Sequence, residues 1–136
     1  MTLEEQLVRD EGCKLQIYQD SVGKWTVGVG RNLQDVGISR DEAMTLLGND
    51  IQNAEARLEQ ELPWAAALDP VRRAVLLNMT FNMGIGGLMK FRKFLAALAA
   101  GDYKTASSEM LASVWAQQVG PRAQRLAIQI ESGCWQ

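Results

Sequence analysis

The sequence predicts an α+β fold with a small lobe built around a β-hairpin, a long connecting helix and a larger all-helical lobe. Apolar residues alternate only between Lys14 and Gly30, one long helical stripe follows at about 39–62, and every later pattern is helical. The 136 residues form a single domain, 1–136. We expect the small lobe at about 12–50, and the helical lobe at about 63–136 together with an N-terminal helix at 1–11.

The N-terminal residues Thr2 to Glu11 are expected to form a short helix. Leu3, Leu7 and Val8 fall on one helical face, and Gly12 is a typical residue for ending a helix.

The next segment, Lys14 to Gly30, changes to a period of two residues. The residues at 20–23, Asp-Ser-Val-Gly, separate two such runs, which predicts a β-hairpin. In the second strand, alternation places Thr26, Gly28 and Gly30 on one face. Two glycines leave that face without side chains, as is typical where a ligand approaches the backbone.

The long helix begins at a capping box, in which Ser39 is followed three residues later by Glu42. It ends before Pro63, because proline disfavours the helical conformation of the residue before it. Residues 32–38 are too few for a further element between hairpin and helix.

The helical lobe begins at Asp69-Pro70, an N-cap followed by proline at the first helical position. Residues 71–83 are apolar almost all round and predict a buried central helix, broken by the glycines at 84, 86 and 87. Shorter helices are expected at Lys90–Ala100, Asp102–Ser113 and Gly120–Glu131.

Composition excludes several classes of function. The chain contains no histidine, which removes Ser-His-Asp and Cys-His nucleophile systems and the commonest zinc sites. Any catalysis must then rest on carboxylates, hydroxyls, amides or a borrowed cofactor. The charged residues are unevenly distributed along the chain. Residues 1–60 have 6 Lys/Arg and 11 Asp/Glu, whereas residues 61–136 have 8 Lys/Arg and 5 Asp/Glu. With an isoelectric point near 5.2 no nucleic-acid partner is expected.

We also expect no targeting signal and no membrane span. No uncharged run approaches the ~20 apolar residues of a membrane span, and the acidic start lacks the apolar region of a secretory signal. We therefore expect synthesis in the cytosol. The sequence neither demands nor excludes a bridge between Cys13 and Cys134, and in that compartment we expect two unpaired thiols.

Without histidine, two carboxylates and a hydroxyl are the candidates for chemistry. Glu11 is in the last turn of its helix, where the helix dipole disfavours negative charge and so favours the protonated form that a general acid needs. Asp20 is at the hairpin turn, and Thr26 is on the face bared by glycine. Two carboxylates in different environments are typical of glycosidases. From their spacing alone these residues could equally have structural roles, since aspartate is common in turns.

Longer motifs occur in order along nearly the whole chain. They are Asp10-Glu11-Gly12, Tyr18-Gln19-Asp20-Ser21-Val22-Gly23, Trp25-Thr26-Val27-Gly28-Val29-Gly30-Arg31-Asn32-Leu33, Ala74 to Gly84 (AVLLNMTFNMG), Trp115, Pro121-Arg122-Ala123, Arg125 and Gly133-Cys134-Trp135. Together they resemble the signature of the T-even phage lysozymes, glycoside hydrolase family 24. The resemblance implies the two-lobed lysozyme-like fold.

The resemblance also implies catalytic roles. Glu11 would protonate the leaving oxygen, Asp20 would assist the developing positive charge or the attacking water, and Thr26 would help place that water. Inversion at the anomeric carbon is the usual outcome of the family, consistent with carboxylates separated by a water.

Substrate contacts are expected in both lobes. The resemblance places Leu33 or its neighbour, Phe81 and Asn82 along the saccharide cleft, and Arg122 beside the catalytic glutamate. Gly30 is added because its bare face admits a ligand.

The sequence departs from the family in two places. Many members have histidine where this chain has Arg31, for which the resemblance suggests Asp50 as the ion-pair partner. The loop between hairpin and long helix is also shorter than in the T-even phage protein, which puts the outer saccharide contacts in doubt.

The implied function is a muramidase that cleaves the β-1,4 bond between N-acetylmuramic acid and N-acetylglucosamine in peptidoglycan during phage-driven lysis, and we expect it to need neither metal nor cofactor. The implied partner is a separately encoded membrane-lesion protein, a holin, that releases the enzyme. We expect a monomer that stays in the host bacterial cytoplasm until lysis and then acts in the periplasm. The alternative is a catalytically silent peptidoglycan-binding module of the same fold on a phage particle or toxin.

Overall fold

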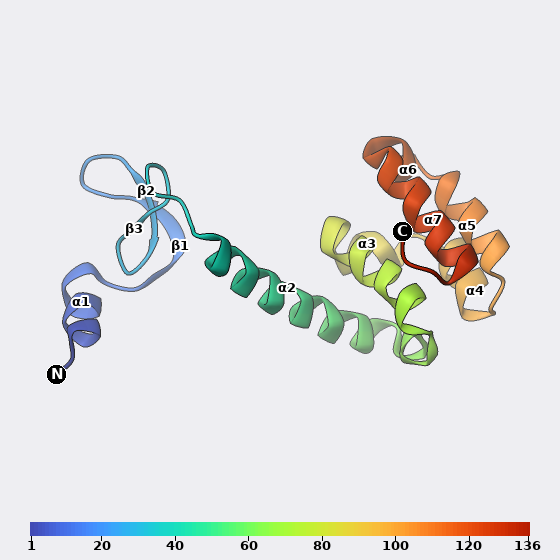
Figure 1. Cartoon of the computed structure of the whole chain (residues 1–136), viewed down its shortest axis with the longest axis horizontal. Helices are drawn as coiled ribbons and strands as arrows, with labels where there is room; N and C mark the ends of the chain where they lie inside the picture. The colour runs from blue at the N-terminus through green and yellow to red at the C-terminus, as the bar shows by residue number, and fades with distance from the viewer. The chain divides into compact units, whose positions relative to one another are not determined.

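The computed structural model describes all 136 residues, which form two compact units, Met1–Leu46 and Leu47–Gln136. Seven α-helices and one small antiparallel sheet confirm the predicted α+β class (Figure 1). By its contacts the N-terminal helix belongs to the first unit. Its grouping with the helical lobe stays a prediction.

The first unit begins with α1 (Leu3–Glu11), close to the predicted bounds. A capping box starts this helix. Thr2 Oγ1 accepts from the Glu5 N–H at 3.1 Å, and the Glu5 carboxylate accepts from the Thr2 N–H at 2.7 Å. Gly12, at φ 77°, ends the helix and turns the chain toward the sheet. Glycine is the usual residue at such a helix end, because it has no Cβ to oppose a positive φ.

The sheet consists of β1 (Lys14–Gln19), β2 (Trp25–Gly28) and β3 (Arg31–Asn32), in that order and antiparallel. The predicted hairpin is therefore confirmed. The expectation that no further element lies between the hairpin and the long helix was wrong, because β3 follows β2. Gly28 and Gly30 have φ values of 68° and 69°, so the chain reverses there instead of extending β2. Glycine permits this reversal because it populates positive φ readily. Gly30 consequently does not share a strand face with Thr26.

Helix α2 (Arg40–Glu61) matches the predicted long helix and crosses the boundary between the units. Its capping box is present as expected. Ser39 Oγ accepts from the Glu42 N–H at 3.1 Å, and Glu42 Oε1 accepts from the Ser39 N–H at 2.9 Å.

The second unit continues with η1 (Pro63–Ala67), α3 (Pro70–Met89), α4 (Arg92–Ala99), α5 (Tyr103–Leu111), α6 (Val114–Val119) and α7 (Pro121–Ser132). The expected break in α3 occurs only at Gly84, where φ is 75° and ψ is 164°, and the helix resumes to Met89. Sequence patterns missed η1 and the six-residue α6, because a single turn or two has too little periodicity to be recognised.

The hydrophobic core lies wholly within the second unit. The buried segment of α3, including Val75, Leu76 and Met79, confirms the prediction of a central helix. The largest fully buried side chains are Leu58, Val75, Leu76, Met79, Leu88, Phe94, Leu98, Met110 and Ile130.

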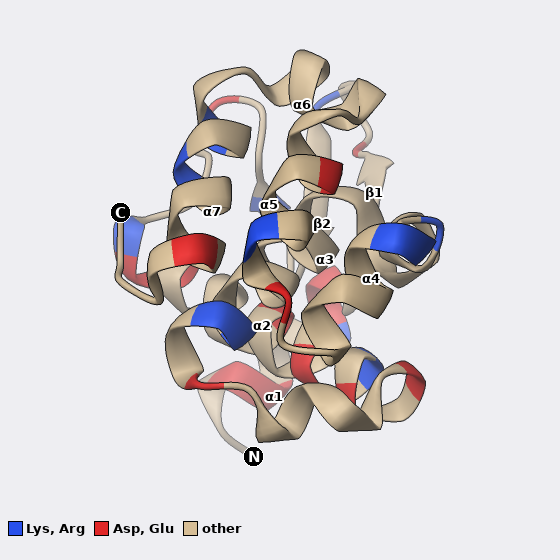
Figure 2. Ribbon diagram, turned by 90° about the vertical axis from the view of Figure 1, so that its right-hand side faces the viewer, with Lys and Arg blue, Asp and Glu red and all other residues tan.

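Charge is divided unevenly between the units. Met1–Leu46 has 5 Lys/Arg and 8 Asp/Glu, whereas Leu47–Gln136 has 9 and 8; Figure 2 colours these residues on the ribbon. None of the helices combines the length and the apolar character required for a membrane span.

Candidate functional site

Glu11, Asp20 and Thr26 all belong to the first unit. Glu11 is the last residue of α1, so its side chain starts where the helix gives way to Gly12 and the sheet. Asp20 follows β1 directly, and Thr26 is the second residue of β2. Local turn geometry and strand pairing therefore position the three predicted catalytic side chains.

The Glu11 carboxyl group reaches the turn that joins β2 to β3. A Cβ atom on Gly30 would lie 3.0 Å from Glu11 Oε2 and 3.3 Å from Glu11 Cδ. Two residues separated by almost twenty positions in the sequence are thus in direct proximity, and the glycine leaves the space for the acid.

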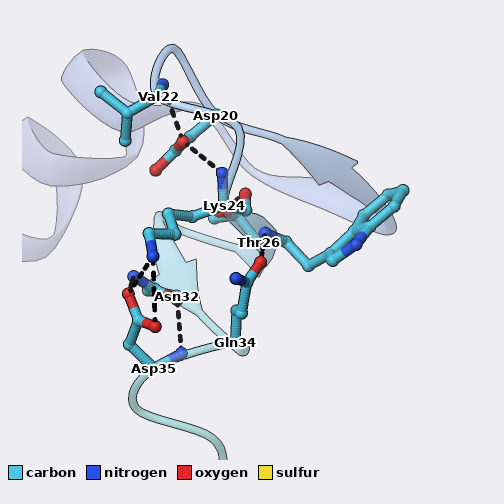
Figure 3. A network of polar contacts seen from close by, with 8 residues as sticks. Asp20, Val22, Lys24, Thr26, Asn32, Gln34 and Asp35 are labelled. Carbon is cyan, nitrogen blue, oxygen red and sulfur yellow. Dashed lines mark hydrogen bonds and ion pairs between the residues drawn. The ribbon is translucent and has the colours of Figure 1, made fainter.

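Asp20 is fixed by the turn that it starts (Figure 3). Its Oδ1 accepts from the Val22 N–H at 3.0 Å and from the Lys24 N–H at 2.8 Å. The Asp20 N–H donates to the Lys24 carbonyl at 2.9 Å, which closes the hairpin. Because both side-chain bonds use Oδ1, Oδ2 has no partner within the protein and can accept from a water or a sugar.

Thr26 is buried, with 3% of its surface exposed, and its hydroxyl donates to the Lys24 carbonyl at 2.9 Å. The hydroxyl proton is therefore occupied, whereas the lone pairs of Oγ1 can still accept. A hydroxyl held in this way can orient a water by accepting one of its protons.

A second set of polar contacts joins Lys24, the residue before β2, to the loop after β3 (Figure 3). Lys24 Nζ lies 3.2 Å from Asp35 Oδ2, and Asp35 also accepts from Asn32 Nδ2 at 3.1 Å. These contacts with Asn32 and Lys24 hold the pKa of Asp35 below its ordinary value. The predicted cleft residue Leu33 lies in the same loop, where its N–H donates to the Trp25 carbonyl at 2.8 Å.

Sequence patterns did not reveal Lys24, Asn32 or Asp35 as neighbours of the candidate site. The Asn-x-x-Asp spacing was the available signal, because asparagine side chains commonly bond the backbone in turns. Asn32 Oδ1 caps the Asp35 N–H in this way at 3.0 Å. The pairing of Asp35 with Lys24 depends on the register of β2 and β3, which the sequence did not predict.

Arg31 forms its ion pair with Glu42, so the prediction that Asp50 is its partner was wrong. Arg31 Nη1 lies 2.7 Å from Glu42 Oε1 and 3.3 Å from the Gly37 carbonyl. The short connection places β3 beside the first turn of α2, where Glu42 already accepts from Ser39. Arg31 and Ser39 together lower the pKa of Glu42 to about 2.

The remaining predicted residues lie in the second unit. Phe81 is half exposed and, together with Asn78 and Arg122, lines a groove of about 690 Å³ between α2, α3 and α7. Arg122 donates from Nε and Nη2 to Asn78 Oδ1 at 3.0 and 2.7 Å. Arg122 was expected beside Glu11, and this pairing stays a prediction.

Asn82 has a different partner. Its Oδ1 accepts from Trp115 Nε1 at 2.8 Å, so an indole from α6 fixes the orientation of the amide. Trp115 was part of the family motif but was not predicted to act on a site residue. The Trp115 side chain is buried, and a buried indole N–H requires an acceptor, which is the physical reason for this pair.

Comparisons with known proteins agree with the motifs. The central spike protein Gp5 of the pre-baseplate of Enterobacteria phage T4 is 31% identical over 98% of this chain, which spans 28% of the spike protein. Probable T4-type lysozyme 1 of Dictyostelium discoideum is 25% identical, over 97% of this chain and 95% of its own length. An endolysin of Acyrthosiphon pisum secondary endosymbiont phage 1 is 31% identical over 76% of this chain and 70% of its own length.

The family assignment covers most of the chain and all three candidate catalytic residues. The model of the phage lysozyme family matches residues 8–129. The α+β architecture described above is consistent with a lysozyme-like fold, and the relatives named lysozyme or endolysin support a hydrolase of that type. The chain belongs to the phage lysozyme family.

Proposed function

We propose that the chain is a muramidase that hydrolyses the β-1,4 bond between N-acetylmuramic acid and N-acetylglucosamine in peptidoglycan. The family match over residues 8–129 carries this proposal, because it includes Glu11, Asp20 and Thr26 within one compact unit. The chain has no histidine, which is consistent with acid–base chemistry carried by carboxylates, as is typical of glycosidases.

In the proposed reaction Glu11 donates a proton to the glycosidic oxygen as its bond to the anomeric carbon breaks. Asp20 stabilises the positive charge that develops on the sugar or accepts a proton from the attacking water. The Asp20 geometry supports either role, since Oδ1 is tied to two backbone N–H groups and Oδ2 is without a partner.

Thr26 is proposed to place the water. Its hydroxyl proton is committed to the Lys24 carbonyl, so Oγ1 is left to accept from that water. The water oxygen bonds to the anomeric carbon from the face opposite the leaving group, and the product is inverted.

We propose Gly30, Leu33, Phe81, Asn82 and Arg122 as saccharide contacts. The contacts of Asn82 with Trp115 and of Arg122 with Asn78 fix these polar groups, which supports a role in orienting a substrate. The shortened loop after β3 is the part of the site where a difference from longer relatives in glycan length is expected.

The proposed biological role is lysis of a host bacterium by a phage. The enzyme would be a monomer held in the host cytoplasm, a holin would open the membrane, and the enzyme would then act on the wall from the periplasm. The spike relative supports a second role, carriage on a phage particle, because a similar segment there is part of a longer protein.

The test is hydrolysis of purified peptidoglycan, followed by release of reducing ends, alongside clearing of permeabilised Gram-negative cells. We expect both signals, undiminished in excess EDTA, and NMR of the first product should show the inverted anomer. Binding to peptidoglycan without release of reducing ends would instead identify a silent wall-binding module. A requirement for added divalent metal would contradict the carboxylate mechanism.

A further inference from the structure

The backbone of Lys24 holds two of the three candidate catalytic side chains. Its N–H donates to Asp20 Oδ1 at 2.8 Å, and its carbonyl accepts from the Thr26 hydroxyl at 2.9 Å. The same carbonyl also accepts from the Asp20 N–H at 2.9 Å. Any movement of the Lys24 backbone would therefore shift Asp20 and Thr26 together.

The next residue, Trp25, is bonded instead to the loop after β3. Its carbonyl accepts from the Leu33 N–H at 2.8 Å and from the Gln34 N–H at 3.3 Å. Its own N–H donates to Gln34 Oε1 at 3.3 Å. Lys24 and Trp25 thus link the hairpin turn to this loop, so the position of the loop affects the backbone that holds the catalytic candidates.

Asp35 joins the same loop to the side chain of Lys24 (Figure 3). Lys24 Nζ lies 3.2 Å from Asp35 Oδ2 and 3.4 Å from Oδ1, so the ammonium group contacts both carboxylate oxygens. Asn32 orients that carboxylate, because its Nδ2 donates to Oδ2 at 3.1 Å and its Oδ1 accepts from the Asp35 N–H at 3.0 Å. Asn32 is also the strand partner of Thr26 in the register of β2 and β3.

The pair of Lys24 and Asp35 contributes little to stability. The two side chains are 37% and 52% exposed, and ion pairs of this exposure add little to the free energy of unfolding. What the pair adds is a fixed distance between the loop after β3 and the residue whose backbone holds Asp20 and Thr26. Its contribution is therefore to geometry at the candidate site.

We propose that Asp35 is a positioning residue, which acts through Lys24 to hold Asp20 and Thr26 in the arrangement that the reaction needs. This inference rests on the proposed function in so far as Asp20 and Thr26 are taken to act on the water and the sugar. A displacement of about 1 Å near the reacting atoms can cost about 10²-fold in rate. The backbone bonds of Trp25 persist when the ion pair is broken, so the expected loss is smaller, about tenfold.

The kinetic test compares Asp35→Asn with Glu42→Gln on soluble peptidoglycan fragments. Each substitution turns a carboxylate into an amide of the same shape and breaks an ion pair of similar exposure, but the Glu42 pair with Arg31 does not involve Lys24. We expect Asp35→Asn to lower kcat by about tenfold with KM within about threefold of the parent, and Glu42→Gln to keep kcat within about twofold. Equal kcat values for the two variants would overturn the proposal, as would an Asp35→Asn loss that lies mainly in KM.

Lys24→Met separates the loss of a contact from a change in the electrostatic field. This substitution removes a positive charge, whereas Asp35→Asn removes a negative one, so a field acting on Asp20 would change kcat in opposite directions. Loss of the contact lowers kcat in both variants, and the double variant should be no slower than the slower single variant, because the same contact is already broken. Opposite changes in kcat, or losses that multiply in the double variant, would overturn the proposal.

Amide hydrogen exchange, followed by NMR, tests the positioning without any activity. The Lys24 N–H is bonded to Asp20 Oδ1, and Asp35 is distant from it in sequence, so Asp35→Asn does not alter the intrinsic exchange rate of this amide. We expect the Lys24 amide to exchange several-fold faster in Asp35→Asn than in the parent and at the parental rate in Glu42→Gln. The Gly12 amide, which donates to the Val8 carbonyl at the end of α1, should exchange equally in all three chains.

This readout would persist if the chain proved inactive, so it distinguishes failure of the proposed function from failure of the inference. An unchanged exchange rate of the Lys24 amide in Asp35→Asn would refute the positioning role. Faster exchange of the Gly12 amide in the same variant would also refute it, because the substitution would then loosen the whole first unit and not the backbone of Lys24 in particular.

Discussion

The two units differ in what they bury. In Leu47–Gln136 the buried side chains are almost all apolar, whereas Thr26 is the single buried residue of Met1–Leu46. The Thr26 hydroxyl donates to a backbone carbonyl. The second unit contains the entire hydrophobic core. The first unit obtains its shape from helix caps, a closed hairpin turn, positive-φ glycines and ion pairs. Units of this small size rarely bury enough apolar surface for a core of their own.

This difference predicts how the two units respond to substitution. Removing a core side chain in the second unit should lower the free energy of unfolding, because packing is lost. Changing a polar group near the candidate site in the first unit should alter the chemistry more than the stability, since few apolar contacts depend on it.

The largest effect is expected for Glu11→Gln, which preserves the shape of the side chain but cannot donate the proton. Positioned general acids contribute about 10² to 10⁴-fold. We therefore expect kcat on peptidoglycan to fall by about that factor, with the far-ultraviolet circular dichroism and the denaturant midpoint close to those of the parent. Near-parental turnover would assign the proton donor to another residue.

The opposite pattern is expected for Phe94→Ala in the core of the second unit. Phe94 is 1% exposed and meets the ring of Phe91 edge-to-face at 6.3 Å between centroids. Truncation of a buried phenylalanine costs about 3–5 kcal/mol. Urea unfolding should show this loss, and Phe81→Ala is the matched control because Phe81 is half exposed on the groove. Equal destabilisation by the two substitutions would contradict the placement of the core.

A smaller loss is expected for Arg72→Lys, which tests the polar link between α3 and the end of α7. Arg72 donates from Nε to the Ile130 carbonyl at 2.6 Å and from Nη2 to the Glu131 carbonyl at 3.0 Å. Its guanidinium also lies 3.6 Å from the centre of the Tyr103 ring.

Lysine cannot reproduce this planar set of donors and the stacking together, so a cost of about 1.5–3 kcal/mol is expected in urea unfolding. Arg73→Lys is the control, because the adjacent Arg73 makes only a 3.8 Å ion pair with Glu55. It should change the free energy of unfolding by less than about 0.5 kcal/mol. A similar loss for both variants would show that the bonding pattern specific to Arg72 does not account for the effect.

Elements with local signals could be predicted from the sequence. The capping box at Ser39, the proline at the start of α3 and the glycine after α1 each determine a helix end through contacts within a few residues. Periodicity predicted the central helix for the same reason. The α+β class followed from these signals.

Contacts that depend on how distant segments meet could not be predicted. The strand β3 has two residues and no periodicity, and the proximity of Gly30 to Glu11 brings the β2–β3 turn close to the end of α1. The partner of Arg31 was assigned incorrectly because the family resemblance suggested a residue two turns further along α2 than Glu42. The motifs identified Glu11, Asp20 and Thr26, but the hydrogen bonds that hold Asp20 and Thr26 depend on how the hairpin turn folds.

The smallest effect, and the sharpest test of the polar first unit, concerns Glu42. Contacts with Arg31 and Ser39 lower the pKa of Glu42 from 4.5 to about 2. Because the folded-state pKa is depressed, the ionised group contributes stability that is fully present above pH 4.5 and is lost as the pH falls through about 2. Glu42→Gln retains the capping bond to Ser39 but removes the charge, so the free energy of unfolding should depend less steeply on pH between 4.5 and 2 than in the parent. Glu59→Gln, on the same helix but without an ion pair, should leave that dependence unchanged. If the Glu42→Gln chain followed the parental curve, the contacts of Glu42 would not contribute to the stability of the first unit, and helix capping and turn geometry would have to account for its fold.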